Sequence, residues 1–185
     1  MFSKSLIERV TSILLRPHET WEAIRQESLP LSSVLQEYVL QLALIPAIAH
    51  FLGFWALIGF VNSLSRALLL YGLTLGSIWV VSRIIFLWSK ELDIEVDSSR
   101  CMQLASFGFV PYFVSGIFYL VPPLMIFVLL GGMYGVYLLL VGIPIFFEIP
   151  KEKSGSYLFP IALSMFLLFI FIGHLTGGVF WPSKS

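Results

Sequence analysis

The stretch Leu124–Phe147, LMIFVLLGGMYGVYLLLVGIPIFF, decides what kind of protein this chain forms. It contains no charged residue, and it is as long as the roughly 20 mostly apolar residues that a helix needs to cross a bilayer. A helix satisfies its backbone hydrogen bonds internally, which is the condition for crossing lipid. The stretch therefore predicts a transmembrane helix.

The composition extends this interpretation to most of the 185 residues. Apolar residues make up 58% of the chain and charged residues 12%, against about 45–50% and about 25% in ordinary soluble domains. A soluble protein of this size keeps a large fraction of its surface in water and could not hide so much apolar area. The lipid bilayer is therefore the expected solvent and the first predicted partner.

Four further apolar stretches have the length of a membrane-spanning helix, and polar residues or prolines bound each of them. We therefore predict an all-α integral membrane protein with five transmembrane helices. The predicted spans cover residues 38–61, 67–88, 101–121, 124–147 and 157–181, and a short tail follows at 182–185. Asn62–Arg66 is expected to separate the first two spans.

Lysine and arginine residues are distributed unequally between the predicted loops. Nine of the eleven lie on the side of the amino terminus, whereas Arg66 and Lys184 lie on the other side. Because basic loops resist translocation, we expect a cytoplasmic (inner) membrane protein with its amino terminus in the cytoplasm and its carboxyl terminus outside. Tails in different compartments require an odd number of spans, which agrees with five.

Residues 1–37 precede the first span and lack the continuous apolar core of a signal peptide. Apolar side chains recur at helical spacing at Phe2, Leu6, Val10, Ile13 and Leu14. This first helix is expected to end before Pro17, and a second should cover Glu19–Glu27 with Trp21 and Ile24 on one side. Together they predict an amphipathic helical elbow on the cytoplasmic face, which either lies on the leaflet or packs on the ends of the spans.

The predicted spans contain few groups that can carry chemistry. Every aspartate and glutamate lies outside the apolar cores or at their margins, so a proton-coupled carrier would lack its usual carboxylate relay. The candidate cavity or inter-helix polar residues are His50, Gln103, Tyr112 and His174. Bonding to carbonyl or hydroxyl groups of neighbouring helices is their main interpretation. A water-accessible cavity lined by His50, Gln103 or Tyr112 would favour transport instead.

Glycines recur at small-xxx-small spacing in three of the predicted spans. The pairs are Gly72 and Gly76, Gly131 and Gly135, and Gly173 and Gly177. Such pairs let helix backbones approach closely, so they predict helix-packing faces. Faces beyond those that the bundle itself uses would serve a homodimer or another membrane-protein partner.

Signatures of catalysis and of bound groups are missing from the sequence. It has no His-Glu-x-x-His zinc helix, no Gly-x-Ser-x-Gly elbow and no phosphate-binding glycine loop, and Cys101 is its one cysteine. Its 11 basic and 11 acidic residues cancel, so no net field attracts nucleic acid. We therefore predict no catalytic residue, cofactor, metal or nucleic-acid partner, and a protein that is not an enzyme.

Three segments are similar to a known family. They are Leu15–Ile24 with its Pro17, Thr20 and Trp21, Ala105–Pro111 with its Gly108 and Pro111, and Tyr134–Gly142. With the amphipathic start and five spans, the chain resembles the YIP-domain family of Ypt/Rab-interacting membrane proteins, and looks closest to its prokaryotic branch. The resemblance implies a non-enzymatic role in membrane organisation or recruitment of partner proteins. It leaves GTPase binding open, because the Asp-Leu-Tyr-Gly-Pro element of eukaryotic members is absent.

The residues also leave an alternative function, a channel or transporter for an ion or small solute. Its basis is the central Gly131-Gly132 pair together with prolines inside the spans. Such residues break helices and can expose backbone groups to a bound ion.

Overall fold

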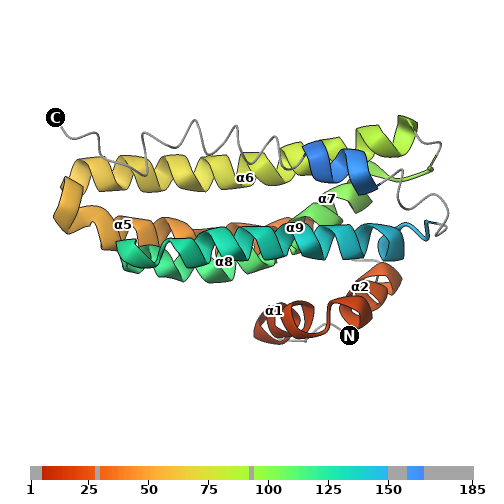
Figure 1. The fold of residues 1–185 in the computed structure, drawn as a ribbon, viewed down its shortest axis with the longest axis horizontal. Coiled ribbons are helices and arrows are strands. Elements are labelled where there is room, and N and C mark those ends of the chain that lie inside the picture. Colours follow the sequence, from red (N-terminus) through yellow and green to blue (C-terminus); the bar gives the residue numbers. More distant parts are fainter. Residues whose placement is uncertain (1–5, 28–29, 92–93, 150–157, 165–185) are drawn as a thin grey trace.

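The structure is a computed structural model that describes residues 6–27, 30–91, 94–149 and 158–164 (Figure 1). Every regular element in these ranges is helical, as the all-α prediction requires. Four of the described helices are long and apolar enough to cross a membrane. The chain is therefore a multi-pass membrane protein.

The amino-terminal segment forms two short helices, α1 (Leu6–Leu15) and α2 (Pro17–Gln26). α2 begins two residues before the predicted Glu19, because proline fits the first turn of a helix, where its fixed φ is already helical and its missing N–H is not needed. Figure 1 shows both helices below the bundle, with α2 beneath one end of α9. We call the end of the bundle that carries α2 the inner end.

The first span, Leu31–Ile58, consists of four successive helical pieces. They are α3 (Leu31–Ser33), the π-helix η1 (Val34–Val39), α4 (Leu40–Leu42) and α5 (Leu44–Ile58). The second span is the single helix α6 (Phe60–Glu91). The turn between them is Gly59, whose φ of 82° is reached readily only by glycine.

This turn lies earlier than the expected loop, because Asn62–Arg66 belong to α6. The polar side chains are accommodated on the helix by bonding to its own carbonyls. Asn62 donates to Ile58 O at 3.0 Å, and Ser65 donates to Val61 O at 2.9 Å. The turn between the first two spans is therefore at Gly59 and not at the polar residues Asn62–Arg66.

The third span runs from α7 (Ser98–Gly108) through α8 (Val110–Ser115) to the 3-10 helix η2 (Gly116–Leu120). It starts three residues before the predicted Cys101, because the Asp97 carboxylate accepts the backbone N–H of Ser99 and caps the helix. The fourth span consists of the 3-10 helix η3 (Pro122–Leu124) and α9 (Ile126–Phe146). The turns at Gly59 and Val121 mark the outer end of the bundle.

The start of the predicted fifth span is described for residues 158–164, which are helical. Ile161 is buried, and the Trp88 indole N–H donates to Ser164 Oγ at 3.1 Å. The rest of that span, and the tail at 182–185, lie outside the described residues.

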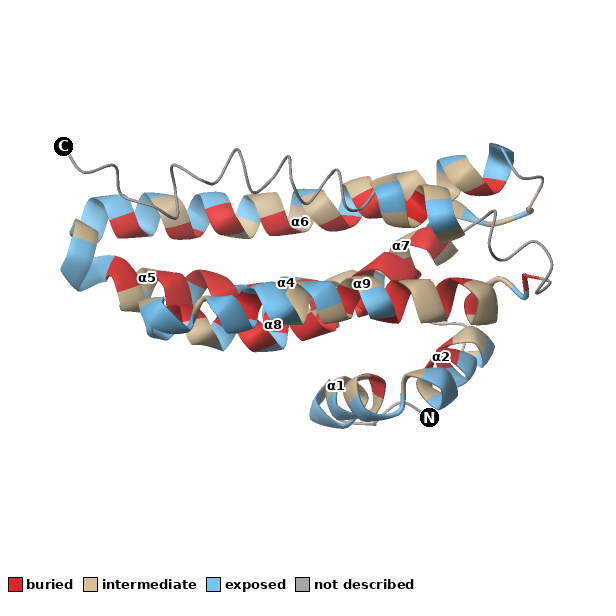
Figure 2. Ribbon diagram, in the orientation of Figure 1, coloured by how far each residue is buried: buried red, intermediate tan, exposed pale blue. Residues whose placement is uncertain are grey.

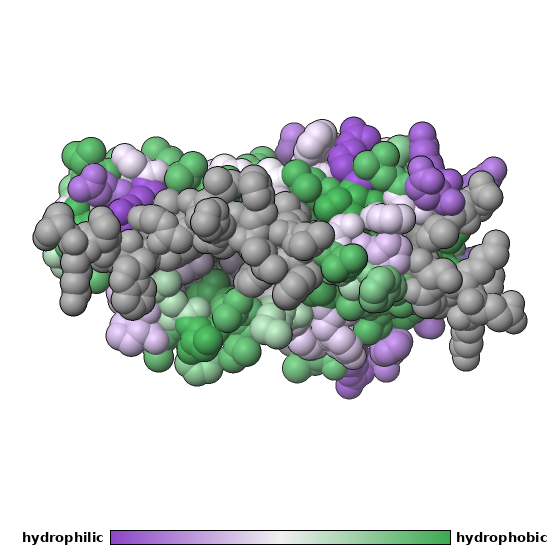
Figure 3. Space-filling view, turned by 45° about the horizontal axis from the view of Figure 1, so that its top comes forward, coloured by the Kyte–Doolittle hydropathy of each residue, from purple (hydrophilic) through white to green (hydrophobic). Residues whose placement is uncertain are grey.

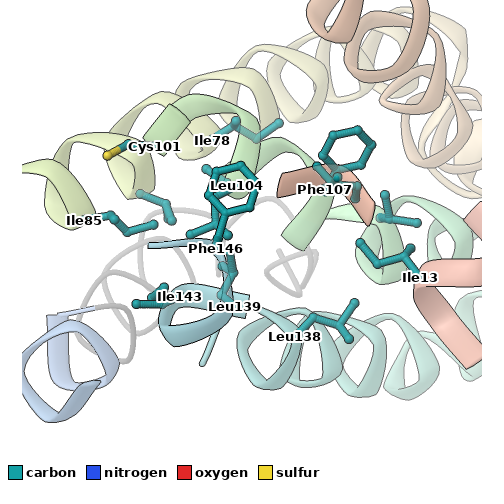
Figure 4. Packing of buried hydrophobic residues seen from close by; sticks show 14 of the residues in the cluster. Ile13, Ile78, Ile85, Cys101, Leu104, Phe107, Leu138, Leu139, Ile143 and Phe146 are labelled. Atoms are coloured by element: carbon teal, nitrogen blue, oxygen red, sulfur yellow. The ribbon is translucent and has the colours of Figure 1, made fainter. Parts of the chain in front are cut away.

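The described helices share one large apolar core and one small one. The large core joins α1 and α2 to α6, α7 and α9, and Figure 4 shows Ile13, Leu104 and Leu139 among its members. Figure 2 shows α7 enclosed among its neighbours with mostly buried residues. The small core lies toward the outer end and comprises Ala49, Leu70, Tyr119 and Val128. Packing is therefore densest toward the inner end.

Candidate functional site

Trp21 is the centre of the contact between α2 and α9. Its side chain is completely buried, and its indole N–H donates to Leu138 O at 3.1 Å. The ring meets Phe146 edge-on, with centroids 6.1 Å apart. Gly142 lies directly under the indole, so that a Cβ at this position would collide with the ring. We call Leu138, Gly142 and Phe146 the Trp21 socket.

The sequence of α2 explains why Trp21 points into the socket. Pro17 begins the helix, and the Thr20 hydroxyl donates to Arg16 O at 2.8 Å across the first turn. Trp21 and Ile24 are then one turn apart on the same face, and both are buried. Glu22, one position further round, is exposed. Of the predicted family-motif residues, Pro17 and Thr20 thus form the start of the helix and Trp21 its anchor.

α1 is attached to the bundle by a second set of contacts. Ile13 is buried in the large core, and the Tyr134 hydroxyl donates to Leu14 O at 2.8 Å. Arg9 pairs with Glu27 at 2.6 Å and lies over the ring of Tyr38. The Arg9–Glu27 pair links α1 to the end of α2, and the contact of Arg9 with Tyr38 links α1 to the first span.

Basic side chains complete the attachment at the inner end. Arg25 pairs with Glu148 immediately beyond α9. Arg100 donates to Arg25 O at 3.1 Å and lies 5.3 Å from the centroid of the Phe146 ring. Sequence reasoning counted these arginines only as markers of orientation. An arginine or glutamate next to a span end gives no indication of which distant segment it will contact.

The predicted glycine and proline residues of the third and fourth spans come together in one close helix crossing. A Cβ on Gly135 would lie 2.7 Å from Gly108 O, and one on Gly131 would lie 2.9 Å from Pro111 O. Both approaches are closer than a methyl group tolerates. Gly108, Pro111, Gly131 and Gly135 therefore occupy a single contact between α9 and the α7–α8 segment.

The other predicted packing glycines have different surroundings. A Cβ on Gly72 or Gly76 would meet no atom of the described residues within 4 Å. Gly173 and Gly177 lie outside the described residues, as does His174.

Polar side chains from three spans gather near the small core. His50 is completely buried, stacks on Phe54 with centroids 4.4 Å apart, and meets Tyr119 edge-on at 5.7 Å. The Tyr112 hydroxyl lies 3.4 Å from Thr74 Oγ1, which itself donates to Leu70 O. Thr74 and Tyr119 were not predicted. Threonine and tyrosine are common in apolar helices, so neither stands out in the sequence. Only the fold shows that Tyr119 lies against His50 and that Thr74 lies against Tyr112.

Gln103 is buried in α7. It lies nine positions before Tyr112 and so more than two helical turns toward the inner end. In the part of the chain that the structure describes, no three histidine, cysteine, aspartate or glutamate side chains are placed to hold a metal ion.

Comparison with known proteins agrees with this architecture. The family model described as the Yip1 domain matches residues 11–173. The inner membrane protein YohC of Escherichia coli strain K12 is 27% identical over 165 residues, covering 82% of this chain and 85% of that protein. YohC of Escherichia coli O6:H1 strain CFT073 matches to the same extent. No solved structure matches the chain.

Proposed function

Because the chain belongs to the Yip1 domain family, we propose that it is a non-enzymatic inner-membrane protein that organises the membrane or recruits partner proteins to its cytoplasmic face. The name of its relative YohC supports the inner membrane as the location. The proposal includes five spans, a cytoplasmic amino terminus and an external carboxyl terminus.

The observation that carries the proposal is the way α2 is presented. Its inward face is held by Trp21, by the Arg25–Glu148 pair and by Arg100. Its outward face carries exposed polar side chains, namely His18, Glu19, Glu22 and Gln26. A helix that is fixed on one side and polar on the other suits recognition of a partner, because little order must be created on binding.

The experiment compares the wild-type chain with an α2-face variant, His18→Ala/Glu19→Lys/Glu22→Lys. Both are purified from native membranes under mild conditions, and membrane morphology is recorded in cells that lack the protein. We expect the wild type to retain a reproducible protein or lipid partner that the variant loses, with an altered morphology on deletion. Recovery of no partner together with unchanged morphology would contradict the proposal.

A channel or carrier is the second candidate, and the polar cluster of His50, Thr74 and Tyr112 favours it. Ionisable and polar groups inside a membrane often mark a solute path. An open pocket of about 690 Å³ at the inner end is bounded by Lys90 and residues 94–97 and contains none of these residues. Liposomes containing the chain would show solute flux that His50→Phe reduces if this candidate were right, and no flux across a broad solute panel would exclude it.

A further inference from the structure

The exposed side chains of the first span change character along its length. Near the inner end they are mostly polar: Ser32, Gln36, Glu37 and Gln41 are exposed, with Leu40 as the apolar exception. Beyond Gln41 the large exposed side chains are apolar: Leu44, Ile48, Leu52, Trp55 and Leu57. Residues 42–58 cover about 25 Å at 1.5 Å per residue, close to the thickness of a hydrocarbon core of about 30 Å. The lipid belt of this span therefore begins near Gln41.

α9 shows the same limit. Its large exposed apolar residues all lie between Ile126 and Tyr137. From Leu138 to Phe147 no residue is exposed, because the inner part of α9 is covered by α2 and α7. Figure 3 shows one face of the molecule with apolar residues on both sides of the centre, and with hydrophilic residues mainly toward the right end besides a smaller group at the left.

On the separate helices, the exposed apolar residues end at the same level along the long axis of the bundle. Tyr38 meets Phe107 with ring centroids 5.7 Å apart. Gly108 follows Phe107 in the chain and is in close contact with Gly135 of α9. Gly135 lies half a helical turn before Tyr137, where the exposed apolar residues of α9 end. On α6 the exposed Trp79 lies under the guanidinium of Arg83, at 5.5 Å from the ring centroid. Tyrosine, tryptophan and arginine are the residues that mark a membrane–water boundary. Between this boundary and the inner end of α6, Leu87 is the large apolar residue that is exposed.

The distribution of the core agrees with this boundary. Most of the large core, including Trp21, Ile85 and Ile143, lies on the inner side of it, and a smaller part with Leu42, Ala43, Val110 and Phe113 continues past it. The small core lies among the lipid-facing segments. Apolar burial stabilises packing in water but contributes little between helices that lipid already surrounds. A dense core is therefore expected where the bundle stands in water.

α1 lies at the height of the boundary, since Tyr134 of α9 donates to its Leu14 carbonyl. Its exposed residues include Ile7, Glu8, Thr11 and Leu15. Ile7, Thr11 and Leu15 form a strip at successive spacings of four residues, and the Glu8 carboxylate borders this strip on the same outward face. Ile7 is 73% exposed and Leu15 is 74% exposed. The Thr11 hydroxyl donates to Ile7 O at 2.8 Å, so it is already satisfied by the helix itself. The Thr11 hydroxyl therefore adds no unpaired donor when the strip enters lipid.

We propose that the Ile7–Thr11–Leu15 strip of α1 inserts into the headgroup and upper acyl region of the cytoplasmic leaflet, while α2 and the inner ends of α6, α7 and α9 stand in water. The occupant of the strip is lipid, because it continues the apolar belt of α9 at the same height. The side of the membrane follows from the proposed function, but the depth does not.

The test measures depth in the full chain, reconstituted in phosphatidylethanolamine and phosphatidylglycerol liposomes. Single cysteines on a Cys101→Ala background carry a spin label at Ile7, Leu15, Glu22, Gln36 or Leu52, all of which are exposed. The readout is the ratio of collisions with oxygen, which concentrates in lipid, to collisions with a water-soluble nickel chelate. We expect ratios at Ile7 and Leu15 that approach that of Leu52 and exceed those of Glu22 and Gln36 several-fold.

Either of two results would overturn the inference: Ile7 and Leu15 as accessible to nickel as Glu22, or Glu22 and Gln36 as shielded as Leu52. A second measurement needs no variant: an apolar carbene reagent dissolved in the bilayer should label α1 and leave α2 unlabelled in the wild-type chain. Absence of label on α1 would also contradict the inference. Neither measurement depends on a partner. The depth inference can therefore fail while the proposed function holds, and the proposed function can fail while the depth inference holds.

Discussion

At the scale of single residues, we expect Trp21 to contribute more to the attachment of α2 than the charged residues near it. Its buried indole fills the Trp21 socket and donates one hydrogen bond to Leu138 O. Replacing a buried tryptophan by alanine leaves a cavity, which in protein cores lowers the free energy of unfolding by about 3–5 kcal/mol. We expect Trp21→Ala to release α2 from α9.

The measurement for Trp21→Ala is protease cleavage between α2 and the first span, combined with thermal unfolding in detergent. Trp21→Phe should lose less, about 1 kcal/mol, because it keeps most of the ring and loses the hydrogen bond. Glu22→Ala, on the exposed face of the same helix, is the matched control. Equal cleavage of Trp21→Ala and Glu22→Ala would show that the socket does not hold the helix.

Two neighbouring glycines of α9 provide a second test at this scale. Gly135 faces Gly108 O, whereas a Cβ on Gly132 would meet no atom of the described residues within 4 Å. Gly135→Ala should therefore force α9 and α7 apart and lower the unfolding temperature. Gly132→Ala should be neutral or stabilising by up to about 1 kcal/mol, since alanine favours the helix. Thermal unfolding checks both, and a larger loss from Gly132→Ala would contradict the predicted crossing.

At the scale of elements, the two amino-terminal helices act as one unit because Arg9 and Glu27 join their far ends. The Arg9 side chain is 12% exposed and that of Glu27 is 35% exposed, so the pair is intermediate between a surface and a buried one. Arg9→Met would leave the Glu27 carboxylate partly buried without its cation. We expect a loss of about 1–3 kcal/mol in the free energy of unfolding, between the values for exposed and buried pairs.

Arg16→Met is the matched control for this prediction. Arg16 pairs with Glu19 at 3.7 Å, and both side chains are 74% exposed. Water and salt screen such a pair, which contributes at most about 0.5 kcal/mol. Chemical denaturation of the two variants should separate them clearly. If they differ by less than the error, Arg9 does not link the helices.

At the scale of the whole molecule, the charge distribution predicts the orientation. Nine of the eleven lysine and arginine residues lie on the predicted cytoplasmic side, and translocating them is unfavourable. A reporter that is active only outside the cytoplasm should work when fused after Ser185 and fail when fused before Met1. A cytoplasmic reporter at the same two positions should give the opposite pattern. Both termini on the same side would contradict the odd number of spans.

Sequence reasoning predicted the helical, membrane-spanning character of the chain and its family, because both depend on local composition and on short patterns. It also predicted that Trp21 and Ile24 share a face, since that follows from helical spacing alone. It did not predict the turn at Gly59, because polar residues in Asn62–Arg66 can bond to helix carbonyls as easily as they can form a loop.

What the sequence determined by itself is therefore that its long apolar stretches form membrane-spanning helices and which residues share a helix face, because both are properties of neighbouring residues. Only the tertiary structure decided that Trp21 enters a socket on α9, that Gly108 faces Gly135, and that His50, Thr74 and Tyr112 come from different spans to one region. These contacts join residues far apart in the chain, and helix packing in lipid depends on shape rather than on a solvent-driven pattern. No local pattern in the sequence encodes such a pairing.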